Sequence, residues 1–126
     1  MTRDQRQQLV TEWSSHAFGH EQATDLKQRS VRLLEETIEA YQAVGADPAM
    51  AHKLVDFVFA RPAGELNQEL GGIGVCVLAL AAAAGFSADD EELREVTRVL
   101  AKPIDHFTAR NAAKNAAGFL AIDGAK

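Results

Sequence analysis

The sequence predicts an all-α protein, a bundle of about four to five helices. Alanine is abundant, the 126 residues include only three prolines, and strand-length runs of alternating apolar and polar residues are nearly absent. Because a chain of this length can bury a core without disulfides, we expect a single domain over residues 1–126.

The first half of the chain predicts two helices. The first covers about residues 3–16. Thr24 or Asp25 can cap a second helix, which runs to Gly45, a residue suited to the position just after a helix end. Four apolar side chains of the second helix fall on one stripe that we expect to face the core: Val31, Leu34, Ile38 and Tyr41.

The middle of the chain predicts two more helices. Asp47 followed by Pro48 is a favourable helix start, and it opens a third helix that ends at the break 61–64. A fourth helix runs from about Glu65 to Ala84, where Gly85 stops it.

The remaining sequence predicts a fifth helix and a last helical piece. Ser87 precedes the acidic stretch 88–92, so it is expected to cap a helix that runs to about Lys102. Pro103 interrupts the pattern, and a final helical segment ends at Gly118. We expect the tail, residues 119–126, to be loosely ordered.

Composition excludes several classes of function. The net charge of −5 argues against a nucleic-acid binder, which normally carries a basic face. The single cysteine, Cys76, cannot form an internal disulfide, so we expect a reducing cytoplasm and a cysteine buried in the fourth helix. The apolar run 73–86 is shorter than the ~20 residues of a membrane span, and the N-terminus lacks the apolar core of a signal peptide.

Two expected helices each carry a pair of glutamates beside an apolar stripe. Glu36 and Glu39 are three residues apart on the second helix, and Glu65 and Glu69 are four apart on the fourth. Helical bundles build carboxylate metal sites from such pairs, and Mg²⁺ prefers oxygen ligands. The same pairs also suit a solvated acidic face, so the residues alone leave both interpretations open.

The motifs resemble those of the MazG-like, all-α nucleotide pyrophosphohydrolases. That family carries EExxE on one helix and ExxD on a later one, commonly within ELGD before an apolar run. Here EExxE is complete as Glu35, Glu36 and Glu39. The second motif begins with Glu69 and then departs, because Gly72 stands where the family has aspartate, as in a Gly-Gly variant group. The resemblance covers about residues 25–85.

The resemblance implies a Mg²⁺-dependent enzyme, with Mn²⁺ as a substitute. It would cleave a nucleoside triphosphate to the monophosphate and pyrophosphate, and it would assemble as a homodimer or homotetramer. Glu36, Glu39 and Glu69 would be metal ligands, and Glu65 could replace the oxygen that Gly72 lacks. Glu35 would orient water, so Glu35 and Glu36 are the expected catalytic carboxylates.

Cations and amides near the C-terminus are candidates for substrate binding. Arg110 and Lys114 lie one turn apart with Asn111 beside them, and Arg61 stands at the break before the fourth helix. Arginine and lysine suit phosphate oxygens, whereas asparagine suits a sugar or a base edge. A solvated cationic helix end is the simpler interpretation of residues 109–118, and it stays open.

Other features favour structural roles. His16 and His20 have zinc-pair spacing but no further ligands around them. Gly71 and Gly72 cost about 1 kcal/mol each in a helix, which predicts crowding around them. Besides the enzyme, two interpretations stay open: a MazG-like nucleotide-binding or regulatory module with a degenerate metal site, and a structural helical oligomer whose glutamates meet arginines of a neighbouring protomer.

Overall fold

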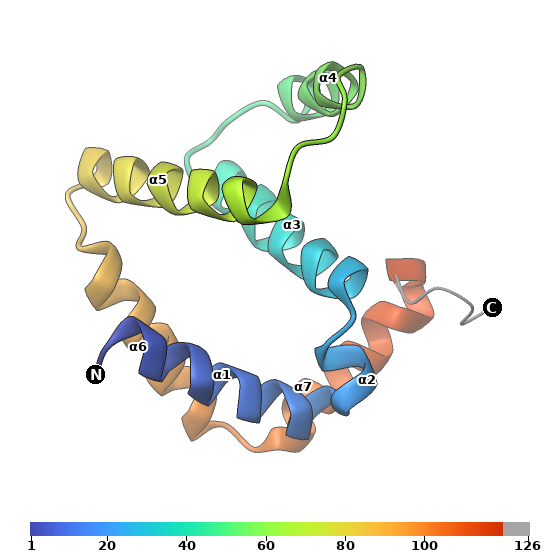
Figure 1. The fold of residues 1–126 in the computed structure, drawn as a ribbon, viewed down its shortest axis with the longest axis vertical. Helices are drawn as coiled ribbons and strands as arrows, with labels where there is room; N and C mark the ends of the chain where they lie inside the picture. Colours follow the sequence, from blue (N-terminus) through green and yellow to red (C-terminus); the bar gives the residue numbers. More distant parts are fainter. Residues whose placement is uncertain (120–126) are drawn as a thin grey trace. The chain divides into compact units, whose positions relative to one another are not determined.

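The computed structural model describes residues 1–119, and every regular element in that range is a helix (Figure 1). The prediction of an all-α protein is therefore confirmed. Of the expected loosely ordered tail, residues 120–126 lie outside the described residues. The order is α1 Arg3–Phe18, α2 His20–Ala23, α3 Leu26–Ala43, α4 Pro48–Phe59, α5 Leu66–Ala84, α6 Ala88–Ala101 and α7 Ile104–Lys114, then a π-helical turn, Asn115–Phe119.

Side-chain caps define where the helices begin. An oxygen of Asp25 accepts a hydrogen bond from the backbone N–H of Gln28 at 2.8 Å, so Asp25 caps α3. Asp47 caps α4 through the N–H of Ala49 at 2.9 Å, with Pro48 as the first helical residue. The Ser87 hydroxyl accepts from the N–H of Asp90 at 3.2 Å, which starts α6. These three starts agree with the sequence predictions.

Glycines end two of the long helices. Gly45 and Gly85 have φ angles of 78° and 80°, in the left-handed region that glycine enters without steric cost. The N–H of the residue after each glycine reaches back to a carbonyl of the last turn, at 3.3 Å for Ala46 to Tyr41 and 2.9 Å for Phe86 to Ala81. Both glycines therefore stop their helices as the sequence predicts.

One helix was not expected from the sequence. Between α1 and α3 the chain forms α2, a single turn that begins after Gly19, whose φ is 80°. The Thr24 hydroxyl closes this turn by donating to the carbonyl of His20 at 2.8 Å. The turn separates α1 from α3 in the chain and carries Gln22, a residue of the polar cluster described below.

The described chain divides into two compact units, and the expected single domain over residues 1–126 stays a prediction. The first unit takes in Met1–Thr37 together with the chain from Glu95 onward. In it α1 packs against α2 and α7. Its small core has Ala17 and Phe107 at the centre, with Trp13 making edge-on ring contacts to Phe18 at 5.3 Å and to Phe107 at 4.9 Å.

The second unit, Ile38–Arg94, contains no buried residue. Its helix α5 is long and apolar enough to cross a membrane by length and composition, and none of it is buried. On α3, which spans the boundary, Leu34 and Ile38 are 55% and 50% exposed. The expectation that their stripe faces a core is therefore wrong for these two side chains in the described chain, whereas Val31 and Tyr41 of the same stripe are half-buried.

Candidate functional site

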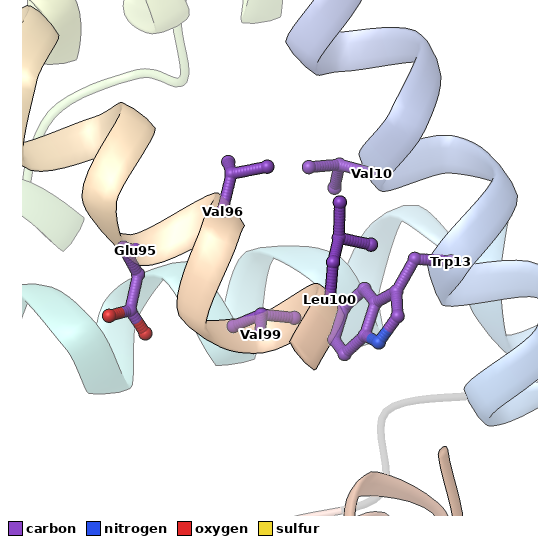
Figure 2. Close-up of a pocket in the computed structure, with 6 residues that line it drawn as sticks. All are labelled: Val10, Trp13, Glu95, Val96, Val99 and Leu100. Atoms are coloured by element: carbon purple, nitrogen blue, oxygen red, sulfur yellow. The ribbon is translucent and has the colours of Figure 1, made fainter. Parts of the chain in front are cut away.

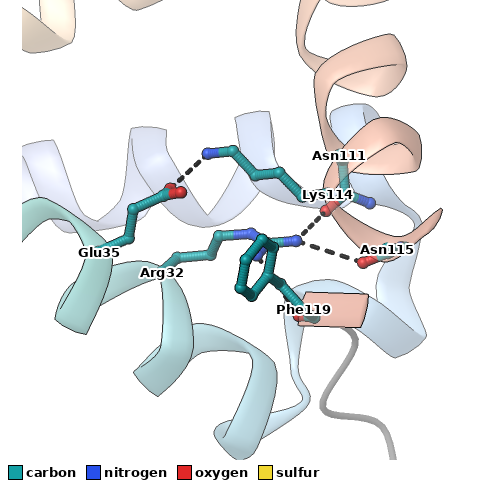
Figure 3. Close-up of polar contacts among 6 residues, drawn as sticks. All are labelled: Arg32, Glu35, Asn111, Lys114, Asn115 and Phe119. Atoms are coloured by element: carbon teal, nitrogen blue, oxygen red, sulfur yellow. Dashed lines mark hydrogen bonds and ion pairs between the residues drawn. The ribbon is translucent and has the colours of Figure 1, made fainter. Parts of the chain in front are cut away.

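A polar cluster joins α3 to the C-terminal helical segment in the first unit, and we call it the α3–α7 cluster (Figure 3). On α3 it contains Gln28, Arg32 and Glu35, and on the C-terminal segment it contains Asn111, Lys114 and Asn115. The α3 members are spaced four and three residues apart, which places them on one helical face. Three residues singled out from the sequence, Glu35, Asn111 and Lys114, are therefore brought together.

The ion pair between Lys114 and Glu35 is the closest contact of the cluster. The Lys114 Nζ lies 2.5 Å from the Glu35 Oε1, and the two side chains are 27% and 34% exposed. The Lys114 ammonium group neutralises the charge of the Glu35 carboxylate. The contact also places this ammonium group at the first residue of the EExxE motif (Figure 3). A cation therefore lies beside Glu35, one of the two predicted catalytic carboxylates.

Arg32 organises the amides on the facing helix. Its Nη2 donates to the Oδ1 atoms of Asn111 and Asn115, each at 3.2 Å. The amide nitrogens of these two asparagines in turn donate to the Gln22 Oε1, at 2.6 Å and 3.3 Å. Both ends of each asparagine amide are thus bonded within the protein, which fixes their orientation.

Gln28, which is buried, and Arg29, which is half-buried, extend the cluster toward Gln22 and Phe18. Gln28 is fully buried, and its amide nitrogen donates to Gln22 at 3.2 Å while its oxygen accepts from Arg29 at 2.6 Å. The Arg29 guanidinium stacks over the Phe18 ring at 4.7 Å, and its Nε has no hydrogen-bond partner among the residues described. Burial, and then the positive charge of Arg32, lower the pKa of Arg29, although Asp25 partly opposes the shift.

The carboxylate of Glu36 is exposed and lies outside the α3–α7 cluster, and it interacts electrostatically with Arg98 of α6. Its negative charge contributes to raising the pKa of Arg98, after the larger effect of the hydrogen bond and charge of Glu95. Arg98 donates through Nε to Glu95 at 2.8 Å and through Nη2 to the other carboxylate oxygen. That hydrogen bond is also the main reason why the pKa of Glu95 is lowered.

The other predicted acidic residues lie in the second unit or at its edge. Glu39 is an exposed residue of α3. Glu65 occupies the position before α5 with an extended backbone, so Glu65 and Glu69 do not form the helical i,i+4 pair that the sequence predicts. The Glu69 carboxylate instead lies over Gly64, where its Oε1 would be 2.5 Å from an added Cβ.

The described residues do not gather a metal-binding group. In the range 1–119 no three histidine, cysteine, aspartate or glutamate side chains lie close enough together to hold a metal ion. Carboxylates remain the donor type that Mg²⁺ prefers, and Glu36 and Glu39 lie one turn apart on α3. The ligand set of Glu36, Glu39, Glu69 and Glu65 therefore stays a prediction.

The two remaining cations predicted from the sequence lie outside the α3–α7 cluster. The Arg61 guanidinium stacks over the Phe57 ring at 4.7 Å, in the second unit. Arg110 is exposed on α7, where its charge helps to lower the pKa of His106. Only Asn111 and Lys114 of the four predicted substrate-binding residues therefore take part in the cluster.

Two expectations about α5 are wrong for the described chain. Cys76 is exposed, because no other element covers its helix. An added Cβ at Gly71 or Gly72 would meet nothing within 4 Å, so the crowding expected around these glycines is absent from the described chain.

Sequence reasoning missed Gln22, Gln28, Arg32 and Arg98. Arg32 carries a readable signal, since it stands one turn before Glu35 and Glu36 and so shares their helical face. Arg98 and Glu95 read as an ordinary surface pair three residues apart. The buried amide of Gln28 left no signal in the sequence.

A second feature of the first unit is an apolar hollow of about 140 Å³ between α1 and α6 (Figure 2). Its walls are Val10, Trp13, Val96, Val99 and Leu100, together with Glu95. The Glu95 carboxylate is held by Arg98, and the other polar side-chain group of these walls, the indole N–H of Trp13, is buried and has no hydrogen-bond partner among the described residues. It does not suit a nucleotide.

The comparisons with known proteins leave the family open. No family model, no curated protein and no solved structure matches the chain.

Proposed function

We propose that the chain is a Mg²⁺-dependent nucleotide pyrophosphohydrolase that cleaves a nucleoside triphosphate to the monophosphate and pyrophosphate. The observation that carries the proposal is the contact of Lys114 with Glu35 at 2.5 Å. It brings a phosphate-binding type of side chain to the EExxE motif from 79 residues away in the sequence. The resemblance of the motifs to MazG-like enzymes supplies the reaction class.

The residues divide into two proposed roles. Glu36, Glu39 and Glu69, with Glu65 in place of the family aspartate, are the proposed ligands, and a bound cation would neutralise charge on the phosphates. Lys114 and Arg110 would contact phosphate oxygens, because an ammonium or a guanidinium group can stabilise the negative charge that develops on these oxygens. Glu35 would orient the attacking water once Lys114 leaves the Glu35 carboxylate and binds a phosphate oxygen.

Pyrophosphate release tests the proposal directly. The full chain would be incubated with the natural ribo- and deoxyribonucleoside triphosphates in Mg²⁺ or Mn²⁺, and pyrophosphate and orthophosphate would be measured separately. We expect pyrophosphate, and a loss of more than about 100-fold in kcat/KM for Glu36→Gln. Glu12→Gln, an exposed carboxylate on α1, is the matched control and should retain activity. Absence of pyrophosphate from the whole panel would refute the proposal.

The position of the missing aspartate offers a gain-of-function test. Gly72→Asp restores the family acid at a site where an added Cβ meets nothing within 4 Å. We expect Gly72→Asp to be activated at a lower Mg²⁺ concentration and to have a higher kcat/KM than the wild type. Gly71→Asp adds the same charge about 100° further round the helix and should bring no gain.

A non-catalytic nucleotide-binding module is the second candidate. Gly72 in place of the acid and the absence of a metal-binding group among residues 1–119 favour it. Calorimetry separates the two candidates. The module would bind nucleotide without metal and would keep that binding in Glu36→Gln, whereas the enzyme needs Mg²⁺ for tight binding.

A further inference from the structure

The two halves of α7 are held within the first unit in different ways. In the first half Phe107 is buried, with its ring 4.9 Å from that of Trp13. The Thr108 hydroxyl also donates to the carbonyl of Ala17 at 2.8 Å. In the second half the buried residue is Asn111, whose side chain is polar. Because an asparagine buries little apolar area, hydrogen bonds fix where the second half lies.

Arg32 of α3 supplies several of these hydrogen bonds from one side chain (Figure 3). Its Nη2 donates to the Oδ1 atoms of Asn111 and Asn115, each at 3.2 Å. Its Nη1 reaches the carbonyl oxygen of Phe119 at a longer 3.5 Å. These partners are four residues apart in the sequence, so one guanidinium group contacts successive turns of the C-terminal helical segment. The planar fork of arginine can donate in several directions at once, which suits it to this position.

Gln22 of α2 holds the opposite end of the same two amides. Its Oε1 accepts from the Nδ2 atoms of Asn111 and Asn115, at 2.6 Å and 3.3 Å. Each amide is therefore bonded at its oxygen by the guanidinium group and at its nitrogen by Gln22. A shift of the helix by one residue would break both contacts, since one residue corresponds to about 100° of rotation and 1.5 Å of rise.

These contacts also determine where Lys114 lies. It is next to Asn115 and three residues after Asn111, so it follows the position of the held segment. A lysine side chain has several rotatable bonds, and its contact with Glu35 at 2.5 Å requires the backbone to be in place already. On the facing helix Glu35 stands three residues after Arg32, so α3 fixes the spacing between the two contacts.

We propose that Arg32 is a positioning residue, which holds the second half of α7 in the register that brings Lys114 to Glu35. Its role in the reaction rests on the proposed function, in which Lys114 passes from Glu35 to a phosphate oxygen. Arg32 is less suited to bind phosphate itself, because both hydrogens of its Nη2 go to the asparagines. Loss of Arg32 would leave Lys114 chemically intact but misplaced.

Zero-length cross-linking tests the positioning without any measurement of activity. A carbodiimide activates the Glu35 carboxylate, and the Lys114 amine then displaces the activating group to form an amide, with the net loss of one water. The link forms only between groups in contact, and these side chains are 34% and 27% exposed, so the reagent can reach them. We expect the Glu35–Lys114 link in the full wild-type chain, detected by mass spectrometry of proteolytic fragments. Arg32→Met should give a small fraction of that yield.

Two further variants separate position from charge. Arg32→Lys keeps the positive charge but loses the planar fork, so it should lose the link as Arg32→Met does. Arg94→Met is the matched control and should keep the link, because Arg94 pairs with Glu91 at 2.5 Å outside the α3–α7 cluster. If Arg32→Met fails to fold, Asn115→Ala provides the same test. It removes one acceptor of Arg32, places a residue that favours helices, and should also lower the yield.

Kinetics test the role of Arg32 in the reaction. Arg32→Met and Lys114→Met should each lower kcat/KM by about 10-fold or more, the loss expected when one hydrogen bond to a charged group is removed. The double variant should lose no more than Lys114→Met alone, because Arg32 acts only through Lys114. A residue that merely stabilises the fold would lower the activity further in the Lys114→Met background.

Three cross-linking results would overturn the proposal. They are absence of the link in the wild type, a wild-type yield in Arg32→Met, and restoration of the link by Arg32→Lys, which would show that charge alone matters. Losses of kcat/KM that multiply in the double variant would equally contradict the role in the reaction. If the wild type releases no pyrophosphate, the proposed function fails, whereas the cross-linking still decides whether Arg32 positions Lys114.

Discussion

Lys114 and Glu35 are each about one-third exposed, so their ion pair is only partly screened by water. Such a pair contributes less than a buried one but avoids most of the cost of desolvation. We expect a double-mutant cycle with Glu35→Gln and Lys114→Met to give a coupling energy of about 0.5–1 kcal/mol. Urea unfolding of the four proteins measures it.

The same cycle has an internal control. Glu35→Gln combined with Arg110→Met should show no coupling, because Arg110 lies on α7 outside the α3–α7 cluster. The Lys114 coupling should also shrink in about 1 M salt, which screens charges beyond a few ångströms. Equal coupling for Lys114 and Arg110 would mean that the general positive charge of α7, and not the contact with Glu35, stabilises the fold.

His106 gives the pH dependence expected of the first unit. Its pKa is lowered by partial loss of hydration and then by the positive charges of Lys102, Arg110 and Arg98. The unfolded chain therefore binds more protons than the folded one between the lowered pKa and about 6.5, so stability rises with pH in that window. NMR titration should place the pKa of His106 below the ordinary value for histidine, about 6.5, and Lys102→Ala should raise that pKa. A His106 titration unchanged by Lys102→Ala would contradict this account.

At the scale of helices, the sequence predicts the helix starts, because these depend on hydrogen bonds between residues close together in the chain. Asp25, Asp47 and Ser87 start helices because their side chains accept N–H groups two or three residues ahead, which sequence reveals directly. The sequence did not predict the turn α2, because four residues produce no periodic pattern. The sequence did not predict the contact of Lys114 with Glu35, because 79 residues separate the two and local sequence patterns carry no information about such distant pairs.

Two glycines on different helices should respond oppositely to alanine. Gly45→Ala forces a Cβ into the left-handed conformation, where φ is 78°, and should lower the free energy of unfolding by about 1–2 kcal/mol. Gly71 lies inside α5, and an added Cβ there meets nothing within 4 Å in the described chain. Gly71→Ala should therefore raise the free energy of unfolding by up to about 1 kcal/mol, because alanine has the higher helix propensity. Thermal unfolding compares the two, and destabilisation by Gly71→Ala would show that another surface contacts that glycine.

At the scale of the whole molecule, the two units differ in what can stabilise them. The first unit has its own small core, in which Trp13 and Phe107 are in contact. In the second unit α4 has 12 residues, near the length of about 12–15 residues below which isolated helices are marginal in water, and the longer α5, with 19 residues, also depends on packing for most of its stability. Because no residue of that unit is buried, its helices need burial against another surface to persist.

If the homo-oligomer that the resemblance implies supplies that burial, protection of the second unit from hydrogen exchange must follow mass action. We expect amide hydrogen exchange in α5 to become faster as the protein is diluted, whereas amides of α1 around Trp13 respond less. Ile73→Glu, which places a charge among the apolar side chains of α5, should show fast exchange in α5 at every concentration. Mass spectrometry of peptides from each helix provides the measurement. Protection of α5 that is independent of concentration, and unchanged in Ile73→Glu, would mean that the covering surface belongs to the same chain.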